Sequence, residues 1–219
     1  MAVKMVQLAN HNEWLKNRMN GIGGSEISAV IGQNPYMSNI DLWELKTGRR
    51  QAEDISDKPY VQYGTQAERH LRGLFRIDFP KFTVDYLDNN SWRNDKYPWA
   101  QASLDGWLTD QQARRGILEI KTSEVLRSMQ KEKWENGKIP QNYYCQVLLY
   151  MAVLEADFAC IKAQLKTMFD GVPYLQTRHY FIEREAVQED IDYLMEAGAA
   201  FWEHVKNDTP PALVLPDLI

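Results

Sequence analysis

Two acidic residues and one lysine are spaced so that they could form a metal-dependent active site. Asp105 and Glu119 flank a predicted turn at residues 111–115, and a hairpin of this length sets two residues on neighbouring strands. Glu119 and Lys121 lie two positions apart in one predicted strand, so their side chains point to the same face. Charged groups inside a hydrophobic domain must be satisfied, and a bound cation flanked by the lysine would satisfy them.

The residue types suit phosphodiester hydrolysis. Carboxylates and a backbone carbonyl are oxygen ligands, which hard cations such as Mg²⁺ prefer. The cation polarises a phosphoryl oxygen and acidifies bound water, while the lysine orients that water or offsets charge on phosphorus. A Glu-x-Lys pair alone is more typical of a salt bridge on a solvated face. The flanking S-L-D-G and G-I-L-E-I-K-T segments favour a metal site, with Mg²⁺ expected and Mn²⁺ as a substitute.

The composition is that of an ordinary globular protein with an acidic balance. Its 219 residues are 44% hydrophobic and 25% charged, and the net charge is −5. This charge argues against a general nucleic-acid binder, which usually carries a basic surface. It does not exclude a nuclease, since a bound cation reverses the charge of an acidic cluster locally. Many basic residues lie in the first two thirds of the chain and indicate either a DNA-binding face or a solvated surface.

The chain is expected to form a single nuclease domain over residues 1–219 in the cytoplasm. No stretch approaches the roughly 20 apolar residues of a membrane span, and the N-terminus lacks the apolar region of a signal peptide. Cys145 and Cys160 lie in apolar runs and are expected to be buried thiols of a reducing compartment. The four histidines show no metal-ligand spacing, so no zinc site is expected.

Hydrophobic periodicity predicts an α/β domain with a central mixed β-sheet flanked by helices. The predicted helices lie at residues 12–19, 25–31, 40–47, 63–78, 140–155 and 185–207. The predicted strands lie at residues 81–88, 99–110 (a hairpin or bent pair), 116–122, 158–168 and 174–182. Thr122 or Ser123 is expected to cap a short helix, since a hydroxyl can satisfy the first N–H groups of a helix.

Five segments carry a wider pattern. They are N-R-M-N-G-I-G-G-S-E-I (17–27), Y-G-T-Q-A-E (63–68), A-S-L-D-G (102–106), L-E-I-K-T (118–122) and Y-Y-C-Q-V (143–147). Together, and in this order, they resemble the phage-type exonucleases related to lambda exonuclease, also called YqaJ-like viral recombinases. The resemblance implies a restriction-endonuclease-like core with extra N-terminal helices.

The resemblance also assigns roles at the metal site. It implies that Asp105, Glu119 and the carbonyl of Ile120 bind the metal. Glu68 would add a carboxylate for a second ion, and Lys121 would lie beside the attacking water. An ion pair with the arginine one helical turn further on is another explanation for Glu68.

The terminal 5′-phosphate of DNA would be held by Arg18, Ser25, Ser103 and Gln146, again by resemblance. Ser25 also suits the N-cap of the helix that follows it. Ser103 lies on the same predicted strand as Asp105, and it could equally be a plain strand serine. Gln146 has apolar neighbours on both sides, and a buried amide needs hydrogen-bond partners.

The expected function is digestion of one strand of linear double-stranded DNA from the 5′ end, leaving 3′ single-stranded overhangs for recombination. The resemblance implies a homotrimer in a bacterial host cell that works with a single-strand annealing protein. The alternatives are an endonuclease or repair nuclease of the same superfamily, and a DNA-binding recombination protein with a dead nuclease core. Trp134, which is surrounded by lysines, is the best candidate for stacking on unpaired bases.

Overall fold

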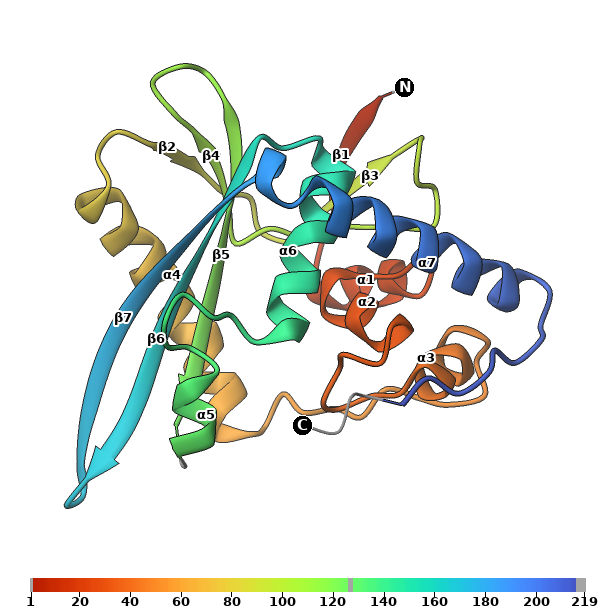
Figure 1. The fold of residues 1–219 in the computed structure, drawn as a ribbon, viewed down its shortest axis with the longest axis horizontal. Coiled ribbons are helices and arrows are strands. Elements are labelled where there is room, and N and C mark those ends of the chain that lie inside the picture. Colours follow the sequence, from red (N-terminus) through yellow and green to blue (C-terminus); the bar gives the residue numbers. More distant parts are fainter. Residues whose placement is uncertain (1, 126–127, 216–219) are drawn as a thin grey trace.

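A five-stranded mixed sheet forms the centre of the computed structural model, which describes residues 2–125 and 128–215 (Figure 1). The strands lie in the order β2–β4–β5–β6–β7. Their bounds are β2 (Thr83–Asp85), β4 (Gly106–Thr109), β5 (Arg115–Glu124), β6 (Phe158–Phe169) and β7 (Val172–Glu183). β5 and β6 are parallel, and the other neighbouring pairs are antiparallel. The predicted mixed sheet is therefore confirmed.

The parallel pairing of β5 with β6 requires a crossover, because a tight turn cannot join two parallel strands. The crossover contains α5 (Ser128–Glu132) and α6 (Gln141–Leu154). α6 begins after Pro140 and ends at Glu155, whose φ of 54° is left-handed. Residues 145–154 are all buried, so α6 is a core helix and holds its side chains in fixed positions beside the sheet.

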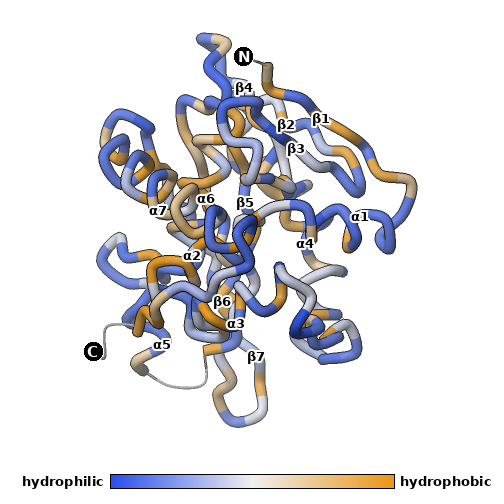
Figure 2. The backbone as a smooth tube through the Cα atoms, turned by 90° about the vertical axis from the view of Figure 1, so that its right-hand side faces the viewer, coloured by the Kyte–Doolittle hydropathy of each residue, from blue (hydrophilic) through white to orange (hydrophobic). Residues whose placement is uncertain are grey.

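The other helices divide between the two faces of the sheet. On the face that bears α6 lie α1 (His11–Arg18), α2 (Gly24–Val30), α3 (Asn39–Lys46) and α7 (Gln188–Lys206), whereas α4 (Pro59–Asp78) covers the opposite face (Figure 1). A short 3-10 helix, Arg184–Ala186, precedes α7. Hydrophobic segments gather toward the interior (Figure 2). Within the described residues, no helix is long and apolar enough to cross a membrane.

A second, two-stranded sheet was not among the predicted elements. β1 (Val3–Gln7) pairs antiparallel with β3 (Asn90–Asn94). β3 has the sequence N-S-W-R-N, and asparagine is depleted in strands. Its local sequence therefore gives little strand signal, and the pairing is decided by contact with a distant segment.

Two local predictions are wrong. The first half of the predicted hairpin over residues 99–110 is irregular and makes isolated bridges to Ile22 and Trp92, so that only β4 is a strand there. The predicted helix cap at Thr122 or Ser123 is also wrong. Both residues belong to β5, where they pair with β6, and the ladder hydrogen bonds outweigh the local preference for capping.

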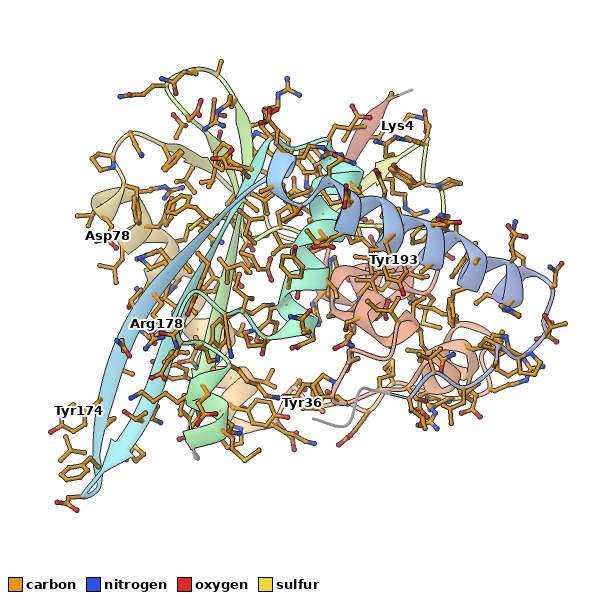
Figure 3. All side chains as sticks on the ribbon, viewed as in Figure 1. Lys4, Tyr36, Asp78, Tyr174, Arg178 and Tyr193 are labelled. Atoms are coloured by element: carbon orange, nitrogen blue, oxygen red, sulfur yellow. The ribbon has the colours of Figure 1, made fainter. Side chains whose placement is uncertain are left out.

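The β6–β7 hairpin extends beyond the end of β5. The last pairing between β5 and β6 joins Glu124 to Lys166, while β6 and β7 stay paired up to their turn. This turn has positive φ at Asp170 (48°) and Gly171 (76°), which is the conformation that a two-residue Asp-Gly hairpin turn requires. Tyr174 lies near the projecting tip (Figure 3).

Candidate active site

The two predicted catalytic acids meet where β4 begins. β4 pairs with β5 only from Gly106 onward, so β5 continues past the end of its neighbour. Asp105 lies directly before β4, and its Oδ2 accepts a hydrogen bond from the Ile120 N–H at 2.8 Å. Since the N–H and C=O of one strand residue point to the same edge, the Ile120 carbonyl is directed to this side as well.

Glu119 and Lys121 share one face of β5, as predicted. The Lys121 Nζ lies 2.7 Å from Glu119 Oε1. Gln146 on α6 contacts both residues: its Nε2 donates to Glu119 Oε1 at 2.6 Å, and its Oε1 accepts from Lys121 Nζ at 3.0 Å. Leu118, on the opposite face of the strand, is fully buried with the side chains of α4. The alternation of β5 therefore separates the polar group from the core.

Burial and mutual repulsion shape the charges of this group. Burial raises the pKa of Asp105 well above its usual range, and the carboxylates of Glu119 and Glu68 raise it further. Burial also raises the pKa of Glu119, although the Lys121 ammonium opposes the change. Burial alone would lower the pKa of Lys121, but the carboxylates of Glu119 and Asp105 raise it overall. Positive charge at this position would relieve the repulsion between the acids.

The donor atoms fit a hard cation. Glu119 Oε2 is buried and has no hydrogen-bond partner among the described residues, and a buried carboxylate oxygen without a partner is costly. A cation bound by Asp105, Glu119 and the Ile120 carbonyl would supply that partner with the oxygen ligands that Mg²⁺ prefers. No three acidic, histidine or cysteine side chains in the described ranges form a ready metal-binding group, so the fit rests on two acids and a carbonyl.

Glu68 faces the same space from α4 but is tied to an arginine. Arg72 Nη1 donates to Glu68 Oε1 at 2.9 Å and also to the carbonyl of Asp105. The guanidinium lies over the ring of Tyr86. The ion pair with Arg72, the other explanation for Glu68, is therefore present in the structure. Glu68 also lines the cleft, where its carboxylate repels that of Asp105.

A single cleft of about 510 Å³ collects every residue that the sequence singled out for the site. The lining includes Arg18, Ser25, Glu68, Ser103, Asp105, Glu119, Ile120, Lys121 and Gln146. These residues come from α1, α2, α4, β5, α6 and the segment before β4. The cleft therefore exists only when both halves of the chain are folded together.

Arg18 and Ser25 form one wall of the cleft. Arg18 Nη2 donates to Ser25 Oγ at 2.9 Å, and the guanidinium lies 4.9 Å from the centre of the Trp14 ring. The prediction that Ser25 caps α2 is wrong, because Gly23 is the N-cap residue. Glu26 satisfies this end of the helix instead, since its Oε2 accepts from the Gly23 N–H at 2.8 Å. The Ser25 hydroxyl is thus left to contact Arg18.

Ser103 and Gln146 already have internal partners. Ser103 lies before β4, not on a strand with Asp105 as predicted. Its Oγ donates to the Asn90 carbonyl at 2.8 Å and accepts from Trp14 Nε1 at 3.1 Å. The Gln146 amide is hydrogen-bonded to Glu119 and Lys121 of β5. All four residues predicted to hold phosphate thus have partners within the chain, and Arg18 and Ser25 contact each other.

A match to a family model shows which protein family this chain belongs to. Residues 13–157 match the model of the YqaJ-like viral recombinase domain, which is more than half of the chain. The chain belongs to the YqaJ-like viral recombinase family. It is 28% identical over 207 residues to the YqaJ protein of Bacillus subtilis (strain 168), and the alignment covers 93% of this chain and 59% of that relative. The YqaJ-like chain thus spans less than two thirds of the relative's length.

Solved structures share the fold of this YqaJ-like chain. An alkaline exonuclease, LHK-Exo of Laribacter hongkongensis, superposes with a TM-score of 0.67 at 20% identity, covering 90% of this chain and 93% of that one. The same enzyme in complex with dAMP gives 0.63 at 19% identity over the same shares. A phage-related exonuclease of Haemophilus somnus 129PT gives 0.52 at 13% identity, covering 86% and 96%. The predicted fold class is confirmed.

Tyr150 and Arg72 were not predicted from the sequence as site residues, and both hydrogen-bond to groups of the site. Tyr150 lies one helical turn after Gln146 on α6, and its hydroxyl accepts from Gln146 Nε2 at 3.0 Å. Burial raises the pKa of this tyrosine well above its usual range, so its hydroxyl stays protonated. Its i, i+4 spacing from Gln146 was an available signal. The sequence indicates Arg72 only as an ion-pair partner of Glu68, because its hydrogen bond to the Asp105 carbonyl joins segments with no local signal for each other.

The prediction that Trp134 stacks on bases is wrong. Its side chain is only 2% exposed and packs between Tyr143 and Tyr180, with ring centres 5.7 and 5.8 Å away. The backbone carbonyl of Trp134 accepts hydrogen bonds from Arg178 and Tyr180, which fasten the loop before α6 to β7. The nearby lysines marked an exposed loop, but the indole itself turns inward.

Proposed function

We propose that this YqaJ-like chain is a Mg²⁺-dependent deoxyribonuclease that digests one strand of linear double-stranded DNA from its 5′ end. The observation that carries the proposal is the single cleft in which Asp105, Glu119 and Lys121 lie beside Arg18 and Ser25. The relatives LHK-Exo and the Haemophilus somnus protein are named exonucleases, and one LHK-Exo structure contains dAMP. These names support a nuclease that releases nucleotides from DNA ends.

The residues of β5 and its neighbours would divide the reaction between them. Bound Mg²⁺ would polarise the scissile phosphate and acidify water, with Mn²⁺ able to replace it. Asp105 and Glu119, with the Ile120 carbonyl, would hold the ion, and Glu68 would contribute where a second ion binds. Lys121 Nζ would orient the attacking water or offset charge on the phosphate. Gln146 keeps the lysine and Glu119 at fixed separation, so little reorganisation is needed.

Arg18 would set where the DNA end stops. Its guanidinium can donate charge-assisted hydrogen bonds to a terminal phosphate, and Ser25 adds a hydroxyl on the same wall. Ser103 and Gln146 would join this group by exchanging internal hydrogen bonds for substrate contacts. A 5′-phosphate seated there would place the first internal phosphodiester near the two acids. Cutting would then proceed from the 5′ end and leave 3′ single-stranded overhangs for recombination.

The assembly and partners belong to the same proposal. DNA ends are the substrate, a homotrimer around the duplex would keep the enzyme on one molecule, and a single-strand annealing protein would receive the 3′ overhang in the bacterial cytoplasm. Because the chain spans 59% of the length of its curated relative, these whole-protein properties need direct tests. An endonuclease or repair nuclease of the same superfamily is the nearest alternative, followed by a dead-core DNA-binding protein.

End-labelled DNA tests the proposal directly. A linear duplex labelled separately at each 5′ and 3′ end is incubated with the protein and Mg²⁺ or Mn²⁺, beside closed circular DNA and an EDTA control. We expect the 5′ labels to be released first as short products, with circular DNA untouched. Cutting of circular DNA would support the endonuclease alternative. DNA binding without cutting in either metal would support the dead-core alternative.

A further inference from the structure

Three charged residues from three helices meet behind the Arg18 wall of the cleft. Lys46, the last residue of α3, donates from Nζ to Glu26 Oε2 at 2.8 Å and to the Arg18 carbonyl at 2.9 Å. Glu26 Oε1 lies 3.4 Å from Arg18 Nη2. Gln101 also donates to the Arg18 carbonyl at 2.8 Å. Arg18 is therefore held at both its backbone and its guanidinium.

Burying these charges costs free energy that a purely structural contact would not require. The Lys46 side chain is fully buried, and that of Glu26 is 8% exposed. A buried ion pair often adds nothing over well-packed apolar residues of similar volume, because both charges must leave water. The Arg18 side chain, by contrast, remains 29% exposed. The two buried charges thus support one partly exposed cation on the cleft wall.

We propose that Glu26 and Lys46 are positioning residues that fix Arg18 and thereby set the preference of the enzyme for a terminal 5′-phosphate. The proposal rests on the proposed function, in which that phosphate binds at Arg18. Lys46 anchors the backbone at the C-terminal end of α1. Glu26 draws one guanidinium nitrogen toward α2, beside the Ser25 hydroxyl, which limits the rotation of the side chain. A bidentate contact with phosphate needs such a fixed plane.

The two residues have opposite charges, and this separates positioning from simple attraction. The measured quantity is the ratio of kcat/KM on a 5′-phosphorylated duplex to that on the same duplex with a 5′-hydroxyl. If charge alone mattered, Lys46→Met would lower this ratio and Glu26→Gln would raise it. Positioning predicts that both variants lower the ratio by at least about tenfold, as small misplacements of a binding group can. Lys16→Met, at an exposed lysine of α1, is the matched control and should leave the ratio unchanged.

A double-mutant cycle tests whether the effect passes through Arg18. In an Arg18→Ala background, Lys46→Met and Glu26→Gln should no longer change the ratio, because interacting residues are not additive. An undiminished effect in that background, or a raised ratio in Glu26→Gln, would overturn the positioning role. Each ratio comes from one enzyme preparation, so a smaller folded fraction cancels. The double variant Lys46→Met/Glu26→Gln, which leaves no unpaired buried charge at this pair, serves if Lys46→Met does not fold.

The ratio measured for the unmodified enzyme distinguishes failure of the phosphate pocket from failure of the positioning role. A ratio near one for the unmodified protein would remove the phosphate pocket from the proposed function, and the positioning role with it. A high ratio that persists in both variants would leave the pocket in place and overturn the positioning role alone.

Discussion

At the scale of single residues, the two acids of the cleft are expected to matter for cutting and not for folding. Asp105→Ala or Glu119→Ala should abolish Mg²⁺-dependent cutting because each removes an oxygen ligand. Asp105→Ala should also leave the metal-free protein about as stable, because this carboxyl is buried with a raised pKa and is repelled by Glu119 and Glu68. Cutting assays paired with thermal unfolding in EDTA measure both effects. Near-normal turnover in either variant would contradict the metal-site assignment.

Lys121 is expected to act on the reaction and not on metal binding. Lys121→Ala should lose most of the turnover, because no other ammonium is hydrogen-bonded to the Glu119 and Gln146 pair among the described contacts. It should still bind Mn²⁺, because both acids remain. Calorimetric titration with Mn²⁺, compared with Glu119→Ala, separates the two roles. A Lys121→Ala protein that fails to bind Mn²⁺, although folded, would show that the lysine shapes the metal site.

At the scale of elements, the contact between α4 and β7 gives a pH-dependent stability. Burial lowers the pKa of His179 on β7, and the nearby Lys162 ammonium lowers it further, while Asp78 opposes them. Lys162 Nζ contacts Asp78 Oδ2 at 3.0 Å, at the end of α4 (Figure 3). A histidine with a lowered folded-state pKa stabilises the fold above its unfolded value of 6.5, and this stability is lost as the pH falls through the folded pKa.

His179→Gln tests that contribution. The variant should show a smaller loss of stability than the unmodified protein when the pH falls from about 7 to about 5, since glutamine takes up no proton in this range. Chemical unfolding at a series of pH values measures the difference. An unchanged pH profile would exclude His179 as the source. Phe79 packs edge-on against the ring at 4.8 Å, so a small constant loss of stability is expected at every pH.

α2 approaches α6 closely at Gly24, beside Gln146 and Tyr150 of the cleft. A Cβ added at Gly24 would lie 2.4 Å from a Tyr150 ring carbon and 2.7 Å from Gln146 Cγ. Gly24→Ala should therefore cost about 1–3 kcal/mol of stability, as overpacking does, and slow cutting by displacing Gln146. Gly73→Ala in α4 is the control, because a Cβ there meets nothing within 4 Å. Equal stability and activity of both variants would show that the α2–α6 contact is loose.

At the scale of the whole molecule, the proposed trimer provides the basis for staying on one DNA molecule. Sedimentation or light scattering at micromolar protein should give about three times the chain mass of 25.5 kDa. Digestion in the presence of excess unlabelled DNA should then continue along the DNA already bound. A monomer at every concentration would remove this basis, although the chemistry of the cleft would be unaffected. The projecting β6–β7 hairpin offers a place to look for subunit contacts.

Strong local patterns in the sequence were enough to predict most of the elements and the residue types of the site. The alternation in β5 set Glu119 and Lys121 on one face, and the apolar run of α6 marked a buried helix that carries Gln146. The mixed sheet followed from the order of these elements. Such features are local, since period and spacing along one strand or helix decide which side chains point together.

Contacts between segments that are distant in the sequence could be identified only in the folded chain. The β1–β3 pairing, the inward turn of Trp134 and the hold of Arg72 on the Asp105 carbonyl join segments with no local signal for each other. Thr122 became a strand residue because β6 supplied ladder partners, which outweighed a capping preference. The Lys46 contact with the Arg18 carbonyl likewise exists only once α1 and α3 have packed. Hydrogen bonds between remote groups depend on the fold, because burial removes water as the competing partner.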